Sequence, residues 1–271
     1  MSMLTSSNPV LSDSALGRLG LGAGSAAETA TIDGVIRKTG FCMTIAIGGG
    51  AAGYKLVSAY PNMALWITIA AAVVGLVMFF AMMATPKAAI IGAPVYSLVE
   101  GAFLGSVSFM LESILTKQGI VLPVGLALQA FVITGSLMAT MLALHAFRII
   151  RAGPRFTAVL SVVTIGIAVT YLVSFVISFF GVQMPFLSLG SAFAGGQSAW
   201  IGLGINGLIL IVAALWLLVD FAQIEEAVAS GAPKWMEWTL AFGLIVTLAW
   251  VYLETLKMLF RLYAMFGSRE E

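Results

Sequence analysis

Long apolar runs recur along almost the whole chain, and they restrict its fold more than any other feature. About 20 apolar residues span the hydrocarbon core of a bilayer as an α-helix. Membrane β-strands alternate in polarity at every second residue, whereas these runs are continuous. We therefore predict an all-α protein, a bundle of seven transmembrane helices. The predicted spans are residues 40–58, 63–84, 88–111, 120–147, 156–180, 199–219 and 238–262.

The composition supports an integral membrane protein and excludes several other classes. Of the 271 residues, 61% are hydrophobic and 9% are charged, which is more apolar surface than a soluble domain of this size buries. A formal net charge of +1 leaves no basic surface for nucleic acid. The single cysteine, Cys42, can form neither an intrachain disulfide nor a cysteine-cluster metal site.

The apolar runs also divide the chain into regions. Residues 1–34 are rich in Ser, Gly, Ala and Thr and lack an apolar run long enough for a signal peptide, so we predict a flexible N-terminal tail. Residues 35–265 form the seven-helix domain, and residues 266–271 form a C-terminal tail. The region 221–237 is predicted to be an amphipathic hairpin, with Gly231 as a helix stop and Pro233 opening the next helix.

Basic residues in short loops predict the orientation, because they accumulate on the cytoplasmic side. A cytoplasmic N-terminus, with seven spans, places the C-terminus outside. The inner side then holds Arg18, Arg37, Lys38, Lys87, Arg148, Arg151, Arg155 and Lys234, and the outer side holds Lys55, Lys117, Lys257, Arg261 and Arg269. This asymmetry predicts a multi-pass membrane protein with its N-terminus in the cytoplasm.

Carboxylates inside the predicted spans are the main functional candidates, since an acid in hydrocarbon is costly and marks function. Asp220 and Glu254 lie in or at the ends of the last two spans, and Glu100 lies near mid-bilayer in the third. Uncharged polar groups, including Gln129 and Asn206, lie on neighbouring spans. Oxygen ligands suit Ca2+, and two adjacent carboxylates can share a proton, so we predict a cation or proton route.

Each acid also has a purely structural interpretation. Glu254 precedes Lys257 by three residues and Arg261 by seven, which is the spacing of an ion pair on one helix face. Asp220 closes an apolar run and could lie at the inner interface. Glu100 has no basic residue within one helical turn, and Lys87 is more than three turns away. Glu100 therefore has the weakest structural explanation.

Other motifs favour packing over chemistry. Gly202, Gly204 and Gly207 match the dinucleotide-binding spacing GxGxxG but lie inside a predicted span instead of after a strand. The pairs Gly49–Gly53 and Gly101–Gly105 allow close helix approach. The only histidine, His145, has no second histidine or recognisable nucleophile motif near it. We expect no enzymatic activity and no cofactor; intramembrane catalysis is the disfavoured alternative, which would depend on His145.

Several motifs together resemble the Bax-inhibitor-like (transmembrane Bax-inhibitor-motif) family. They are LLVDFAQIE at 217–225, WVYLETLKML at 250–259 and VEGAFLG at 99–105. NPVL at 8–11 and GAPKWMEW at 231–238 resemble its bacterial branch, which implies a bacterial inner (plasma) membrane. The resemblance covers roughly residues 8–265.

The resemblance implies a bundle with the last helix central and a pH-sensitive Ca2+ leak channel gated by two acids on the last two helices. By motif, Asp220 and Glu254 are the gate and a tentative Ca2+ site, and Ca2+ is the transported ion. Glu100, Gln129 and Asn206 would line the ion pathway, and Lys87 would be an electrostatic partner. The alternative is a non-conducting regulatory protein that binds another membrane protein, such as a membrane protease.

Two departures from the family pattern affect the gate. The second acid is Glu254, whereas the family has an aspartate, so its side chain is one methylene longer. The hairpin between the acids is also longer than in the characterised channels, since 34 positions separate Asp220 from Glu254. Asp220 lies 11 residues before Gly231 and Glu254 lies 23 residues after it. At about 1.5 Å per residue, straight helices would place the two acids at depths that differ by about 18 Å. Direct contact would require a reoriented hairpin helix or a break near Pro233.

Overall fold

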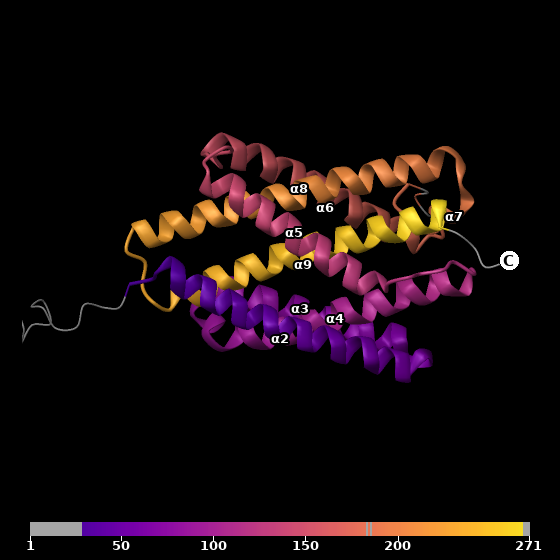
Figure 1. Ribbon diagram of the computed structural model, residues 1–271, viewed down its shortest axis with the longest axis horizontal. Helices are drawn as coiled ribbons and strands as arrows, with labels where there is room; N and C mark the ends of the chain where they lie inside the picture. Colours follow the sequence, from indigo (N-terminus) through magenta and orange to yellow (C-terminus); the bar gives the residue numbers. More distant parts are fainter. Residues whose placement is uncertain (1–28, 183, 185, 268–271) are drawn as a thin grey trace, which may run out of the picture.

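The computed structural model describes residues 29–182, 184 and 186–267, and this part of the chain is a helical bundle without strands (Figure 1). Seven helices are long and apolar enough to cross a membrane, which confirms the predicted all-α, seven-span architecture. They are α2 (Ile32–Ala59), α3 (Ala64–Ala84), α4 (Ala89–Lys117), α5 (Leu126–Ala146), α6 (Pro154–Ser178), α8 (Gly196–Ala229) and α9 (Met236–Phe266). The shorter elements are η2 (Pro61–Met63), η3 (Pro86–Ala88) and α7 (Ser191–Ala194).

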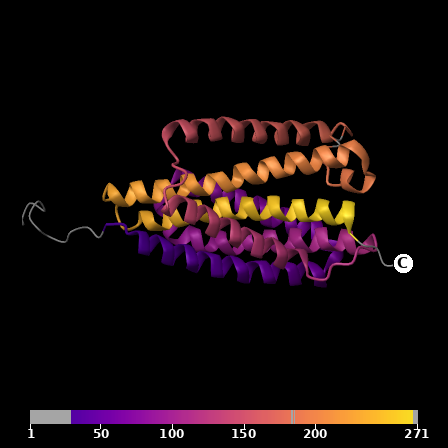
Figure 2. The same ribbon diagram turned by 45° about the horizontal axis from the view of Figure 1, so that its top comes forward.

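The last helix, α9, runs through the middle of the bundle (Figure 1) and packs directly against α2, α4, α5 and α8. It contributes buried residues to three of the four apolar clusters of the core. The helices α3 and α6 lie outside this first ring, where α3 packs mainly on α4, and α6 packs on α8 (Figure 2). The last helix is therefore central, as predicted, although only some of the other helices contact it.

The closest helix pair is α2 with α4, and glycines make it possible. An added Cβ atom at Gly101 would lie 2.0 Å from the Ala46 carbonyl oxygen, and one at Gly105 would lie 1.9 Å from that of Gly50. No side chain fits at these distances, so the backbones touch. The predicted packing role of the Gly101–Gly105 pair is confirmed.

Two helix boundaries differ most from the sequence prediction. The first helix begins at Ile32, inside the predicted tail, because the Thr31 hydroxyl caps it by accepting a hydrogen bond from the Gly34 amide at 3.0 Å. The rest of the predicted tail, residues 1–28, lies outside the described residues. The helix α8 continues ten residues past the predicted end of its span, to Ala229, and Gly231 then turns the chain with φ of +74°.

The two ends of the bundle differ in the number of basic residues that they carry. We call the end where α2 begins the N end and the end where α9 finishes the C end. The N end carries Arg37, Lys38, Lys87, Arg148, Arg151, Arg155 and Lys234, and the C end carries Lys55, Lys117, Lys257 and Arg261. On the C end, Arg261 is 3% exposed, so fewer basic groups reach the surface there.

Candidate functional site

The interface between α8 and α9 holds both acids of the predicted gate. Glu254 lies in the half of α9 nearer the C end, with 2% of its surface exposed. Its Oε2 atom accepts a hydrogen bond from Asn206 Nδ2 of α8 at 2.8 Å, and its Oε1 atom pairs with Lys257 Nζ at 2.5 Å. The carboxylate is therefore compensated, and the local ion pair expected from the Lys257 spacing is present.

Asp220 has a different environment in the half of α8 nearer the N end. Its Oδ2 atom is buried and has no hydrogen-bond partner among the described residues. Thr247 of α9 lies beside the carboxyl group, and no ion pair of Asp220 occurs in this part of the chain. Among the three candidate acids, Asp220 is the one that lacks a partner for a buried oxygen.

Asp220 and Glu254 are not in contact. Thr247, beside Asp220, precedes Glu254 by seven residues, or about 10 Å along α9. Along α8, Asn206 and Asp220 are 14 residues or about 21 Å apart. The fully buried side chains of Leu217 and Val251 pack in the same α8–α9 interface. Both helices are continuous, so the break or reoriented hairpin helix needed for direct contact is missing here, and this conformation lacks a proton shared between the two acids.

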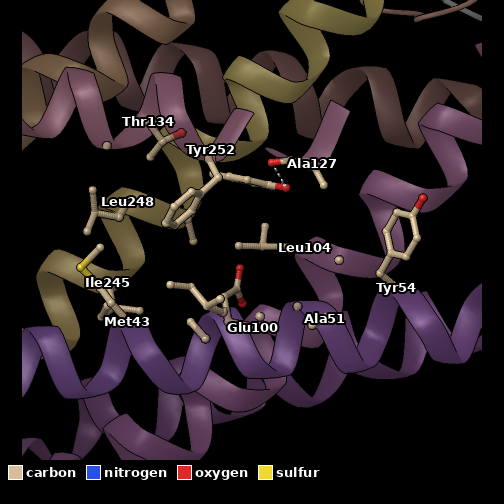
Figure 3. A pocket seen from close by; sticks show the side chains of 18 of the residues that line it. Met43, Ala51, Tyr54, Glu100, Leu104, Ala127, Thr134, Ile245, Leu248 and Tyr252 are labelled. Atoms are coloured by element: carbon tan, nitrogen blue, oxygen red, sulfur yellow. Dashed lines mark hydrogen bonds between the residues drawn. The ribbon is translucent and has the colours of Figure 1, made fainter. Parts of the chain in front are cut away.

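Glu100 lies on α4, where its side chain extends toward the space between Leu104 and Tyr252 (Figure 3). Its Oε2 atom would lie 3.3 Å from a Cβ atom added at Gly75 of α3, so the glycine leaves room for the carboxyl group. No ion pair of Glu100 occurs among the described residues. Glu100 is thus an acid of the protein interior, on a different face of α9 from Asp220.

The remaining predicted site residues lie in three different places. Asn206 contacts Glu254, as described, and its Oδ1 atom is buried without a partner. Gln129 lies near the C end, where its side chain exchanges hydrogen bonds with the Tyr263 hydroxyl at 3.0 and 3.2 Å. Lys87 lies in η3 at the N end, with its ammonium 5.7 Å from the centre of the Trp235 ring. The structure brings Asn206 to the acids but not Gln129 or Lys87.

A buried arginine next to this site was not identified as a packing element from the sequence. Arg261 donates hydrogen bonds to the carbonyl oxygens of Phe186, Leu187 and Ser188 at 3.2 to 3.3 Å, and to the Ser191 hydroxyl at 3.2 Å. It therefore holds the loop before α8 and does not pair with Glu254. The only signal in the sequence was the spacing of seven residues between Glu254 and Arg261, which places both on one face of the helix.

A second buried acid lies at the N end, in the region predicted to be an amphipathic hairpin. Glu237 has no exposed surface, and its carboxylate accepts hydrogen bonds from the Thr31 amide at 2.8 Å and hydroxyl at 3.1 Å. It also pairs with Lys38 Nζ at 2.5 Å and Lys234 Nζ at 3.3 Å. Gly34 allows this approach, because an added Cβ atom would overlap the carboxylate. This cluster ties the start of α2 to the start of α9.

The histidine also lies at the N end. His145 Nε2 is 3.2 Å from Glu225 Oε2, and Arg148 contacts the same carboxylate at 3.6 Å. These groups join the ends of α5 and α8 at the N end. They form a polar cluster between Asp220 and the end of the bundle.

The acids do not form a closed metal site in this conformation. Within the described ranges, no group of three or more His, Cys, Asp or Glu side chains is placed to hold a metal ion. Ca2+ takes six to eight oxygen ligands, and Glu254 already contacts Asn206 and Lys257. The tentative Ca2+ site shared by Asp220 and Glu254 is therefore not assembled.

One protein family matches the chain over almost its whole length. The model of the family described as Bax inhibitor 1 like matches residues 8–264. The chain belongs to this family. No curated protein and no solved structure matches the chain significantly. In this Bax inhibitor 1 like protein, Asp220 and Glu254 are two separate interior acids.

Proposed function

We propose that this protein is a pH-sensitive leak channel for Ca2+ or another cation, gated by Asp220 and Glu254. The observation that carries the proposal is the Asp220 carboxyl group, which lies inside a membrane-spanning helix pair and has a buried oxygen without a partner among the described residues. An unpaired charge in such a place costs several kcal/mol. A proton on Asp220 therefore stabilises the closed packing of α8 against α9.

The packing between the acids supports a gate that is closed in this conformation. Leu217 and Val251 are fully buried in the α8–α9 interface together with Leu248 and Ala213. An ion that moves between Glu254 and Asp220 would have to separate these side chains. Loss of the proton from Asp220 would place an uncompensated charge at Thr247, and separation of the helices would hydrate it. We therefore expect the leak to increase as the pH rises.

Few other groups that could titrate lie close to Asp220, so few of them could cause this pH dependence. On α9 its neighbour is Thr247, which does not titrate in the relevant range. On α8 itself, Glu225 lies five residues further on and faces His145 and Arg148 of the α5 end. In the described part of the chain, no lysine, arginine or histidine pairs with Asp220.

Purified protein in sealed liposomes loaded with a Ca2+ indicator tests the proposal. We expect Ca2+ entry above that of protein-free liposomes, and a lower rate for Glu254→Gln, because the neutral amide leaves the Lys257 charge uncompensated and that charge repels cations. Asp33→Asn is the matched control, since Asp33 lies on the surface and pairs only with Arg37 of its own helix. Liposomes that stay sealed at every pH would refute channel activity.

The same liposome experiment distinguishes the leak channel from the alternative, a non-conducting regulatory protein that binds another membrane protein. The outer helix α6 favours this alternative, because it packs mainly on α8 and, among the described residues, Leu160 is its one buried residue. A partner helix could cover the rest of its surface. Sealed liposomes together with a co-purifying membrane protein that α6 substitutions release would support this function.

We also propose a bacterial inner membrane with the N end in the cytoplasm. The basic residues at the N end support this orientation by the positive-inside rule. A single cysteine introduced at Ser230, in the turn after α8, should react with an impermeant thiol reagent only in inverted vesicles. The proposal gives no catalytic role to His145.

A further inference from the structure

A cavity of about 510 Å³ lies between α2, α4, α5 and α9 (Figure 3). Apolar side chains form most of its walls, among them Met43, Ile47, Leu104, Phe131 and Leu248. Its volume falls within the range of about 300 to 1,000 Å³ that is usual for small-molecule sites. An apolar cavity of this size binds hydrocarbon more favourably than water.

The cavity is long and runs parallel to the helices. Its lining residues extend from Met43 to Lys55 on α2, a rise of 12 residues or about 18 Å. On the opposite wall they extend from Ala127 to Met138 of α5, or about 16 Å. We call this space the α2–α5 slot. Its length covers about half of the hydrocarbon core of a bilayer, which is about 30 Å thick.

The α2–α5 slot opens sideways. In the described structure, α2 and α5 do not contact each other, whereas both contact α4 and α9. Three large apolar residues that line the slot are also exposed on the bundle surface: Ile47 of α2 (52%), and Leu128 (58%) and Phe131 (43%) of α5. The floor, by contrast, includes Ile245 and Ala249 of α9, which are 4% and 7% exposed. The opening therefore faces the lipid, and the floor is reached only through it.

We infer that the α2–α5 slot binds an acyl chain of a membrane phospholipid, which enters from the bilayer between α2 and α5. The apolar walls, the length along the membrane normal and the sideways opening all fit a hydrocarbon chain. At the C end of the slot, Lys55 is exposed and forms no ion pair among the described residues. It lies four residues before the end of α2, where its ammonium can pair with the phosphate of the same lipid.

Glu100 is the one acid that lines the slot, and its neutral form is compatible with a hydrocarbon neighbour. A charged Glu100 would instead require water or a cation in the same space. The lipid site does not depend on the proposed leak activity, because its evidence is the shape, lining and opening of the slot. Its test likewise measures lipid contact and not ion flux.

Photolabelling with a phosphatidylglycerol that carries a diazirine in its acyl chain tests the site in reconstituted vesicles. We expect carbene adducts on Ile245 or Ala249, which bulk lipid cannot reach. Gly135→Phe should remove these adducts, because an added Cβ atom at Gly135 meets nothing within 4 Å and the larger side chain fills the slot. Ala51→Phe blocks the same space from the opposite wall. Gly166→Phe on α6 is the matched control, since that position is also open and does not line the slot.

Labelling of Val162, which is 71% exposed on α6, reports bulk lipid and correct reconstitution in every variant. Adducts confined to exposed positions such as Val162 would overturn the site, and so would adducts on Ile245 that neither slot variant reduces. The headgroup contact has its own test. Lys55→Gln should lower labelling of the floor about fivefold, the factor expected for one lysine near an anionic lipid surface, and Lys55→Arg should retain it. Floor labelling in Lys55→Gln that equals the labelling in Lys55→Arg would overturn the role of Lys55.

Discussion

The buried acid at the N end gives the sharpest prediction for stability. The change is Glu237→Gln, which keeps the size of the side chain and removes its charge. In the native protein this carboxylate accepts two hydrogen bonds from Thr31 and pairs with Lys38 and Lys234. The variant leaves Lys38, whose side chain is only 18% exposed, without its partner.

The expected loss follows from the burial of each pair. Removal of one partner from a buried ion pair costs about 3 to 5 kcal/mol, and the Lys38 pair belongs near the lower limit because its ammonium is partly hydrated. The Lys234 pair adds only a few tenths of a kcal/mol, since Lys234 is 43% exposed. We therefore expect Glu237→Gln to lower the free energy of unfolding by about 3 kcal/mol.

Equilibrium unfolding in mixed detergent micelles, followed by tryptophan fluorescence, measures this loss. Trp235 and Trp238, two of the six tryptophans, flank Glu237, so part of the fluorescence signal comes from the affected region. Asp33→Asn is the control, because Asp33 and Arg37 form a surface pair that contributes about 0.5 kcal/mol or less. A Glu237→Gln variant as stable as this control would refute the buried-cluster reasoning.

Two further predictions concern packing. Gly105→Ala should lower the free energy of unfolding by about 1 to 3 kcal/mol, because its Cβ atom would lie 1.9 Å from the Gly50 carbonyl oxygen; Gly166→Ala, where nothing lies within 4 Å, should not. Unfolding in mixed micelles compares the two, and equal stability would contradict the close α2–α4 approach. Arg261→Gln should cost about 2 kcal/mol, since it weakens charged hydrogen bonds to residues 186–191. Amide hydrogen exchange there should become faster, and unchanged exchange would show that Arg261 does not hold the loop.

The fold was predictable because the apolar runs are long enough to define each span without knowledge of the packing. The helix ends were less predictable, since contacts between distant residues set them. The Ala30 amide donates a hydrogen bond to the Ala232 carbonyl oxygen at 2.7 Å, next to the point where α2 begins. The polar end of α8 packs against the end of α5 through the contact between Glu225 and His145. A hydropathy pattern does not reveal this contact.

The candidate site was predictable in its members and not in its arrangement. The cost of an acid in hydrocarbon identified Asp220, Glu100 and Glu254 from the sequence alone. Which of them has a partner depends on the register between helices, and only the structure provides the Asn206–Glu254 hydrogen bond. The burial of Glu237 could not be predicted, because it arises from contact with Thr31, about 200 residues earlier in the chain.

The initial rate of Ca2+ entry into liposomes across a pH series, compared between the native protein and Asp220→Asn, tests the proposed gate most directly. The asparagine is neutral at every pH, as a protonated Asp220 is. We predict that the native rate rises with pH, and that the variant stays at the low rate of the native protein at acidic pH. A variant whose rate rises with pH as steeply as that of the native protein would contradict the assignment of Asp220 as the pH sensor.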